Sequence, residues 1–269
     1  MGRALVIGSG FGGIASALRL RAAGHDVHLV EKLDSIGGRA QVFEHGGYRH
    51  DAGPTVITAP FLFDELFQLF GERRADYIQF QELKPWYRFT FPDGDHFDYG
   101  GTLEDTLQEI ARIEPRDCAG YESLVAQSKA IFDVGFTELA HAPFHQFGHM
   151  LKQIPALLKL RSDRTVWGLV CQHLINDKLR QAFSIQPLLV GGSPFDTTSI
   201  YGLIHYLERA YGIYFAMGGT GALVQALHDL MLRQGVTIQT QATVKALNHT
   251  GRTVTGATLE SGEVLDADH

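Results

Sequence analysis

Three glycines near the N-terminus have the spacing of a loop that binds a dinucleotide. Gly8, Gly10 and Gly13 form a GxGxxG pattern. In such a loop the first glycine permits a tight turn from strand to helix, the second lets a pyrophosphate approach the backbone, and the third lets the helix pack closely on the strand. The N–H groups at the start of the helix then face the phosphates, where the helix dipole favours negative charge. The spacing therefore predicts a phosphate site at residues 8–13.

An acidic residue follows the loop at the distance expected for a ribose contact. Glu31 closes the second apolar run of the chain, about 20 residues after the glycines, where a carboxylate accepts hydrogen bonds from ribose hydroxyl groups. Its charge would repel a 2′-phosphate, so NADP is disfavoured. NAD and FAD both remain open at this point, because both contain an ADP half.

The segments around the glycines predict the elements that must hold them in place. Residues 4–7 are continuously apolar, as in a strand buried on both faces of a parallel sheet. Residues 14–23 have the pattern of a helix that ends at Gly24, and residues 27–30 form the next apolar run. We therefore expect a βαβ unit.

The predicted secondary structure changes twice along the rest of the chain, from alternating strands and helices to mainly helices and back. Helical spacing over residues 60–71 is followed by alternating aromatic residues around a turn at 92–94, which predicts a hairpin, and Thr102 resembles a helix N-cap. Helical patterns dominate from there to about Tyr211. A helix over 223–231, a strand over 236–238 and a final hairpin over 253–265 then restore the βα character.

Composition excludes several classes of protein. The 269 residues carry a net charge of −7 without a long basic run, which argues against a nucleic-acid partner. Cys118 and Cys171 lack the spacing of a metal or redox site. The N-terminus has no pattern of an export signal, and no run reaches the 18 or more apolar residues of a membrane span. We expect an ordinary globular protein of the cytoplasm.

Several later segments resemble a known family of flavoproteins. Gly37-Gly38-Arg39 and the run DAGPTVIT at 51–58 resemble the superfamily of amine oxidases, protoporphyrinogen oxidases and carotenoid desaturases, and DAGPTVIT is most similar to bacterial phytoene desaturases. The resemblance spans the chain, in the family's order. It also covers residues 84–89, 93–99, 179–184, 188–195, 199–205 and 217–223.

The resemblance implies an α/β fold whose Rossmann-like FAD-binding domain, with a parallel sheet, is interrupted by a mainly helical substrate domain containing a β-hairpin. It places the first part of the FAD-binding domain at residues 1–80, a partial substrate and membrane-facing domain at 81–214, and an incomplete second part of the FAD-binding domain at 215–269. Because the family's chains continue beyond this point, we expect a C-terminally truncated stretch whose own activity is impaired.

The family pattern also implies FAD as the cofactor and assigns residues to it. The glycine loop would hold the pyrophosphate, Glu31 the adenosine ribose, and a strand in the second half would present backbone groups to adenine. The residues near the isoalloxazine would be Gly53, Pro54 and Thr55. The implied cofactor-binding residues are Gly8, Ser9, Gly10, Phe11, Gly12, Gly13, Glu31, Lys32, Gly38, Arg39, Gly53, Pro54, Thr55 and Val244.

As a family member the protein would remove two hydrogens from adjacent carbons of a phytoene-like polyene and so lengthen its conjugation. The cofactor carries that chemistry, so no catalytic side chain need stand out. Residues 185–217 are suited to line a hydrocarbon channel or to form a packed core. Arg180, Asp196, His205 and Glu208 are ionisable residues that could relay protons or serve only structural roles.

Two other functions stay open beside the carotenoid desaturase. One is another flavoenzyme of the superfamily, such as an amine oxidase or a carotenoid isomerase. The other is a fragment that binds FAD without catalysis. A yellow preparation would support the enzymes, and pigment formation in phytoene-accumulating cells would separate them.

A histidine series and the segment around it raise two further hypotheses. His141, His145 and His149 are spaced for one helix face, but Pro143 interrupts a continuous helix, so we expect no metal site. Residues 136–160 are apolar with interspersed His and Lys, which is typical of an amphipathic surface. We expect this surface to lie on the inner membrane, with the protein at its cytoplasmic side, because the polyene is insoluble in water.

Overall fold

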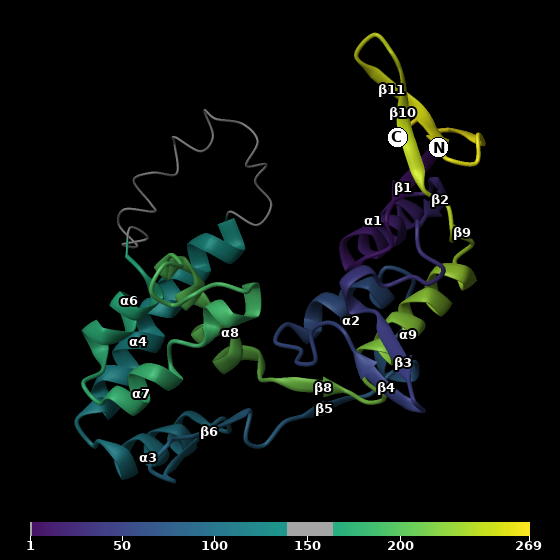
Figure 1. The fold of residues 1–269 in the computed structure, drawn as a ribbon. Helices are drawn as coiled ribbons and strands as arrows, with labels where there is room; N and C mark the ends of the chain where they lie inside the picture. The colour runs from purple at the N-terminus through teal and green to yellow at the C-terminus, as the bar shows by residue number, and fades with distance from the viewer. Residues whose placement is uncertain (1, 139–163) are drawn as a thin grey trace. The chain divides into compact units, whose positions relative to one another are not determined.

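The computed structural model describes residues 2–138 and 164–269, and the chain divides into two compact units (Figure 1). Unit 1 combines Met1–Gln81 with Tyr214–His269, and unit 2 is the continuous stretch Glu82–Ile213. Unit 1 is therefore built from two pieces of chain that are far apart in the sequence. The histidine series at 141–149 lies outside the described residues, as does nearly all of the proposed amphipathic surface at 136–160.

Unit 1 contains the expected βαβ unit. β1 (Arg3–Ile7) and β2 (Asp26–Val30) pair in parallel, with α1 (Phe11–Ala22) between them in the sequence. β9 (Thr237–Gln239) pairs in parallel with β2, which gives a sheet of order β1-β2-β9. α1 buries Ile14 and Leu18 completely. The helix starts at Phe11, three residues before its predicted start. The sequence pattern missed this first turn because it contains glycines, which weaken a helix pattern.

Two more helices complete the core of unit 1. α2 (Pro60–Gln68) begins with proline at its first position, where the missing N–H costs no hydrogen bond, and buries Phe67. α9 (Thr220–Arg233) buries Leu227, Leu230 and Met231 in the same apolar cluster as α1 and α2. Its apolar residues recur three and four positions apart, so one face of the helix turns inward.

Short strands connect and extend this core. β3 (Val42–His45) and β4 (Tyr48–Asp51) form a hairpin, which the sequence pattern did not indicate because its side chains are mostly exposed. β5 (Phe80–Glu82) pairs with β8 (Tyr214–Ala216). β10 (Val244–Thr250), β11 (Thr253–Leu259) and β12 (Val264–Asp266) form an antiparallel sheet that includes the predicted final hairpin.

Unit 2 is mainly helical and begins with the predicted hairpin. β6 (Tyr87–Thr90) and β7 (His96–Tyr99) pair antiparallel. α3 (Leu103–Ile113) starts at the predicted N-cap Thr102, which forms a reciprocal capping box with Asp105. The helices that follow are α4 (Asp117–Phe132) with a π-helical continuation over Asp133–Glu138, α6 (Val166–His173), α7 (Asp177–Ala182), α8 (Leu203–Tyr211), and the 3-10 turns Gln186–Val190 and Ser199–Gly202.

Aromatic rings fill the interior of unit 2. Phe183 lies 5.5 Å from Phe97, 5.3 Å from Tyr99 and 4.8 Å from Tyr121, measured between ring centroids. These distances are typical of edge-on and offset ring packing. Within residues 2–138 and 164–269, no helix has the length and apolar character needed to cross a membrane.

Candidate cofactor site

The glycine loop leaves open space beside its backbone at the start of α1. Gly8 adopts a φ of +94°, which glycine tolerates and other residues rarely do. A Cβ atom added to Gly8, Gly10 or Gly12 would meet no atom within 4 Å. The N-cap residue Gly10 supplies no side-chain cap to α1, so the N–H groups of the first turn can donate hydrogen bonds to an external acceptor. This geometry fits a phosphate group.

Gly13 differs from its neighbours because it packs against the strand. A Cβ atom at Gly13 would lie 1.9 Å from the carbonyl oxygen of Gly8. The third glycine therefore has the packing role expected from the sequence, and the cradle around the first two stays open.

Glu31 is held against the same loop. It is only 5% exposed. Its Oε2 atom accepts hydrogen bonds from the backbone N–H of Ser9 at 2.8 Å and from the Ser9 hydroxyl at 2.6 Å, and its Oε1 atom accepts from the N–H of Leu33 at 3.0 Å. Burial acts to raise the pKa of Glu31, but these hydrogen bonds outweigh it and hold the pKa below its usual value. An ionised carboxylate is thus fixed at the end of β2.

The second glycine turn touches the first. The N–H of Gly37 donates to the carbonyl of Ser9 at 3.0 Å, and a Cβ atom at Gly38 would lie 2.9 Å from the Cα of Gly10. Arg39 follows in a short 3-10 turn, Gly38–Ala40, and is exposed. In the part of the chain that the structure describes, Arg39 forms no ion pair. The turn thus places the backbone of an exposed arginine next to the open glycine loop.

The DAGPT segment continues the same chain of contacts. A Cβ atom at Gly53 would lie 2.2 Å from the carbonyl oxygen of Arg39, so only glycine fits this crossing. Pro54 and Thr55 are exposed, and the Pro54 carbonyl accepts a hydrogen bond from the Thr220 hydroxyl at 2.5 Å. The predicted residues of 8–13, 38–39 and 53–55 therefore form one continuous surface.

Val244, the residue predicted to contact adenine, lies close to the end of β2. It packs with Val30, Ala242 and Leu259 in a small apolar cluster. The N–H of Ala242 donates to the Glu31 carbonyl at 2.8 Å, which ties this segment to the end of β2. Lys32, the remaining predicted residue, is exposed directly after Glu31.

Two residues near the site were not predicted. Gln241 has a φ of 55°, the one non-glycine residue with positive φ in the described chain, and its N–H donates to the Leu33 carbonyl at 2.8 Å. Such strain costs about 1–3 kcal/mol and concentrates at functional sites. Asp51 accepts a hydrogen bond from the N–H of Thr220 at 3.0 Å and so caps α9. Neither role has a sequence signal, because each depends on segments distant in the chain.

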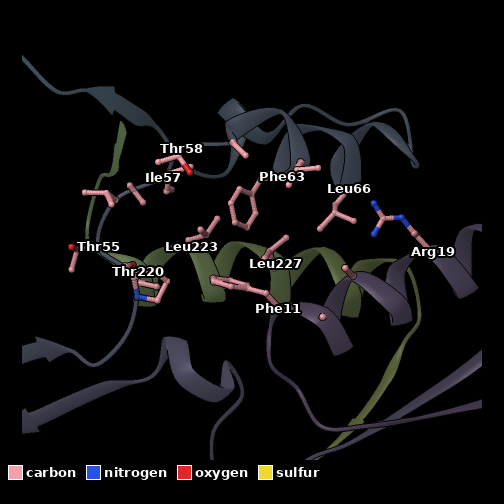
Figure 2. Close-up of a pocket in the computed structure, with 17 residues that line it drawn as sticks. Phe11, Arg19, Thr55, Ile57, Thr58, Phe63, Leu66, Thr220, Leu223 and Leu227 are labelled. Carbon is pink, nitrogen blue, oxygen red and sulfur yellow. The ribbon is translucent and has the colours of Figure 1, made fainter. Parts of the chain in front are cut away.

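An apolar cavity of about 410 Å³ adjoins this surface within unit 1. Figure 2 shows side chains of α1, α2 and α9 pointing into it, with Arg19 at one end and Thr55 and Thr220 at the other. The cavity shares Phe11, Gly12, Pro54 and Thr55 with the predicted cofactor site. Its remaining labelled walls are Ile57, Thr58, Phe63, Leu66, Leu223 and Leu227.

The ionisable residues predicted as possible proton relays lie in unit 2. Arg180 donates to the Leu174 carbonyl and pairs with Asp177, while Asp196 is exposed. His205 and Glu208 are buried. Among the described residues, no group of three His, Cys, Asp or Glu side chains is placed to hold a metal ion.

Comparisons with known proteins point to a family of flavoproteins. The model of the family "Flavin containing amine oxidoreductase" matches residues 11–269. The lycopene-forming phytoene desaturase of Pseudescherichia vulneris is 42% identical over 100% of this chain and 54% of its own length. That of Pantoea ananas is 43% identical over 96% of this chain and 52% of its own length. The chain spans about half the length of the curated relatives it matches.

Solved structures show the same fold at low identity. Cyclohexylamine oxidase from Brevibacterium oxydans superposes with a TM-score of 0.62 at 20% identity, covering 100% of this chain and 56% of the oxidase. A putrescine oxidase mutant superposes with a TM-score of 0.58 at 16% identity, covering 99% and 56% of the two chains. These likenesses establish the α/β architecture of the fold.

Proposed function

The chain belongs to the flavin-containing amine oxidoreductase family, and from that membership we propose that it forms the FAD-binding part and a portion of the substrate-binding part of a carotenoid desaturase. The complete protein would introduce C=C bonds into a long apolar polyene such as phytoene. The observation that carries the substrate class is identity of 42–43% to two phytoene desaturases over nearly the whole chain.

The site geometry supports FAD as the cofactor. Open backbone at Gly10 and Gly12, together with the exposed cation of Arg39, suits the pyrophosphate. Glu31, whose pKa is held below its usual value, would bind the adenosine ribose, and Val244 would offer its backbone to adenine. Lys32 would lie at the adenosine end, and Gly53, Pro54 and Thr55 at the isoalloxazine end.

The chemistry of the desaturation would be supplied by the cofactor, since a bound flavin accepts a hydride equivalent from carbon. The residues of this chain would bind and orient the groups. Glu31 would hold the ribose, and the glycine surface would place the pyrophosphate. The apolar side chains of Phe11, Phe63 and Leu223 would keep water out of the neighbouring cavity. Excluding water prevents side reactions of the substrate and the cofactor. We assign no side chain of this chain as the proton acceptor.

A membrane surface is the proposed source of the polyene, with the complete protein at the cytoplasmic side of the inner membrane. Unit 2 supports this with four exposed apolar side chains close together in the sequence. Leu188 is 75% exposed, Leu189 49%, Val190 55% and Phe195 58%. Exposed apolar groups of this kind mark interaction surfaces. Residues 188–195 would offer a membrane contact within the longer segment 185–217, which the sequence pattern suits to a hydrocarbon channel or a packed core.

Cofactor binding can be tested on the chain itself. Titration with FAD, followed by quenching of flavin fluorescence, should show saturable binding. Substituting Arg39→Ala should weaken binding by about tenfold or more, because a charge-assisted hydrogen bond contributes about 1.5–3 kcal/mol. Arg252→Ala removes an exposed arginine from the turn between β10 and β11 and should leave the affinity unchanged. Equal affinities for the two variants would contradict the assigned site.

Desaturation is tested on the complete protein. Expression of the complete gene in phytoene-accumulating cells should yield coloured carotenoids, and substitution of Glu31 by Ala should abolish the colour. A colourless outcome with normal FAD binding would refute the substrate class while leaving the cofactor site intact.

A further inference from the structure

Unit 2 buries a carboxyl group that the proposed chemistry does not use. Glu208 lies on α8 and is 1% exposed. Its Oε1 atom accepts a hydrogen bond from the Tyr87 hydroxyl at 3.4 Å, and its Oε2 atom has no hydrogen-bond partner in the described part of the chain. An ionised carboxylate in this position would lack most of the hydrogen bonds that stabilise a buried charge.

The neighbouring arginine does not neutralise Glu208. Arg209 donates to the carbonyl of Gly101 at 2.8 Å and to the hydroxyl of Thr106 at 2.9 Å. Its guanidinium carbon lies 4.5 Å from the ring centroid of Trp86. The Nε atom of Arg209 has no partner among the described residues. Arg209 therefore ties α8 to the start of α3 and to Trp86, and one of its donors is left unused.

We propose that Glu208 is an uncharged carboxylic acid in the native protein and that its ionisation is a switch that loosens the aromatic interior of unit 2. Once charged, Glu208 would compete for Arg209, the cation beside it. Arg209 would then leave Gly101 and Thr106 and would uncover Trp86. This inference is independent of the proposed cofactor and substrate, since it concerns unit 2 alone.

Glu208 is the group in this part of unit 2 whose pKa lies near neutral pH, because the pKa values of the surrounding groups lie far from it. Burial raises the pKa of Glu208 to about 8, outweighing the interactions with the Tyr87 and Tyr99 hydroxyls and the charge of Arg209. Burial also raises the pKa values of the three facing phenols, Tyr87 on β6, Tyr99 on β7 and Tyr121 on α4, so they stay protonated. On α8 itself, burial lowers the pKa of His205 to about 3, so this imidazole stays neutral.

The sign of the pH dependence follows from these values. A folded carboxyl with a raised pKa binds a proton that the unfolded chain releases near pH 4.5. Its contribution to stability is complete below pH 4.5, declines as the pH rises, and is lost by the time the pH passes through about 8. Unit 2 should therefore loosen on the alkaline side.

Trp86 provides a reporter for this transition. The chain has two tryptophans, Trp86 and Trp167, so the substitution Trp167→Phe leaves a single indole beside Arg209. In this background we expect emission and acrylamide quenching of Trp86 to follow a one-proton titration between pH 6.5 and 9.5, with a midpoint near 8. The urea midpoint should fall as the pH rises from about 4.5 to about 8 and should level off above that.

Two variants decide whether Glu208 is responsible. Glu208→Gln keeps the size and the acceptor for Tyr87 but cannot ionise, so it should abolish both the fluorescence titration and the fall in urea midpoint. Glu122→Gln removes an exposed acid from α4 and should retain both. A titration that persists in Glu208→Gln, or its absence from the Trp167→Phe parent, would overturn the proposal.

A second measurement covers the case in which Glu208→Gln does not fold. Ordinary Asp and Glu side chains are ionised at pH 7, so an infrared carbonyl band of a protonated carboxylic acid in the unsubstituted chain would report the buried group. We expect the band at pH 7 and its loss by about pH 9.5. A spectrum without that band at pH 7 would rule out a neutral Glu208.

Discussion

Adjacent glycines at the start of α1 should respond in opposite ways to the same added methyl group. Gly12→Ala places a Cβ atom in open space, with no atom within 4 Å. Alanine is favoured over glycine inside a helix by about 0.5–1 kcal/mol. Gly12→Ala should therefore raise the free energy of unfolding by roughly that amount.

Gly13→Ala places the same methyl group against β1. Its Cβ atom would lie 1.9 Å from the Gly8 carbonyl oxygen and 3.7 Å from the nearest methyl carbon of Val6. Because the shorter contact involves backbone on both sides, α1 must move away from the strand by about 1 Å or more to restore van der Waals distance. Overpacking of this kind costs about 1–3 kcal/mol, occasionally more.

The two variants should therefore differ by about 1.5–4 kcal/mol in the free energy of unfolding, with Gly13→Ala the less stable. Both tryptophans lie in unit 2, so unit 1 is best followed by hydrogen exchange of the β1 and α1 amides. Exchange should be slower than in the parent for Gly12→Ala and faster for Gly13→Ala. Equal protection in the two variants would refute the close packing of α1 on β1.

Three further outcomes follow from single contacts. Asp51→Ala should destabilise unit 1 by about 0.5–2 kcal/mol, because the N–H of Thr220 loses its acceptor at the start of α9, and thermal unfolding measures this. Thr102→Ala should cost unit 2 a similar amount by breaking the capping box, as seen in urea unfolding followed by tryptophan fluorescence. Glu31→Gln should lower stability at pH 7, and the deficit should shrink below pH 4.5, because a carboxyl with a lowered pKa stabilises only while ionised; unfolding measured from pH 3 to 7 checks the trend.

The local sequence pattern was enough to predict the elements whose side chains are buried in a core or cap a helix. The βαβ unit, the hairpin at 87–99 and the N-cap Thr102 were all predictable, because burial and capping leave a regular spacing of residue types. The β3–β4 hairpin was not predictable in the same way. Its residues are largely exposed, so alternation carries no burial signal.

The close glycine contacts at the candidate site involve residues that the family resemblance singled out, and their contact with a cofactor stays a prediction. The crossing of Gly53 over Arg39 and the approach of Gly38 to Gly10 demand residues without a side chain, and such residues stand out in a sequence. The left-handed backbone at Gln241 and the cap from Asp51 to Thr220 did not stand out. Both features arise from contacts between segments that are distant in the sequence. The residue types at these positions therefore do not predict them.

The division of unit 1 between two distant pieces of chain has a consequence for synthesis on the ribosome. β2 cannot pair with β9 until β9 has been synthesised, since His28 pairs with Thr237. The whole of unit 2 is synthesised between these two strands. At elongation rates of about 5–20 residues per second, that delay is about ten seconds or longer. During it the nascent chain exposes an unpaired parallel edge and lacks the segment that ties down the Glu31 loop. Cofactor capture should thus be a late event, and chaperones that shield β2 should raise the yield of folded protein.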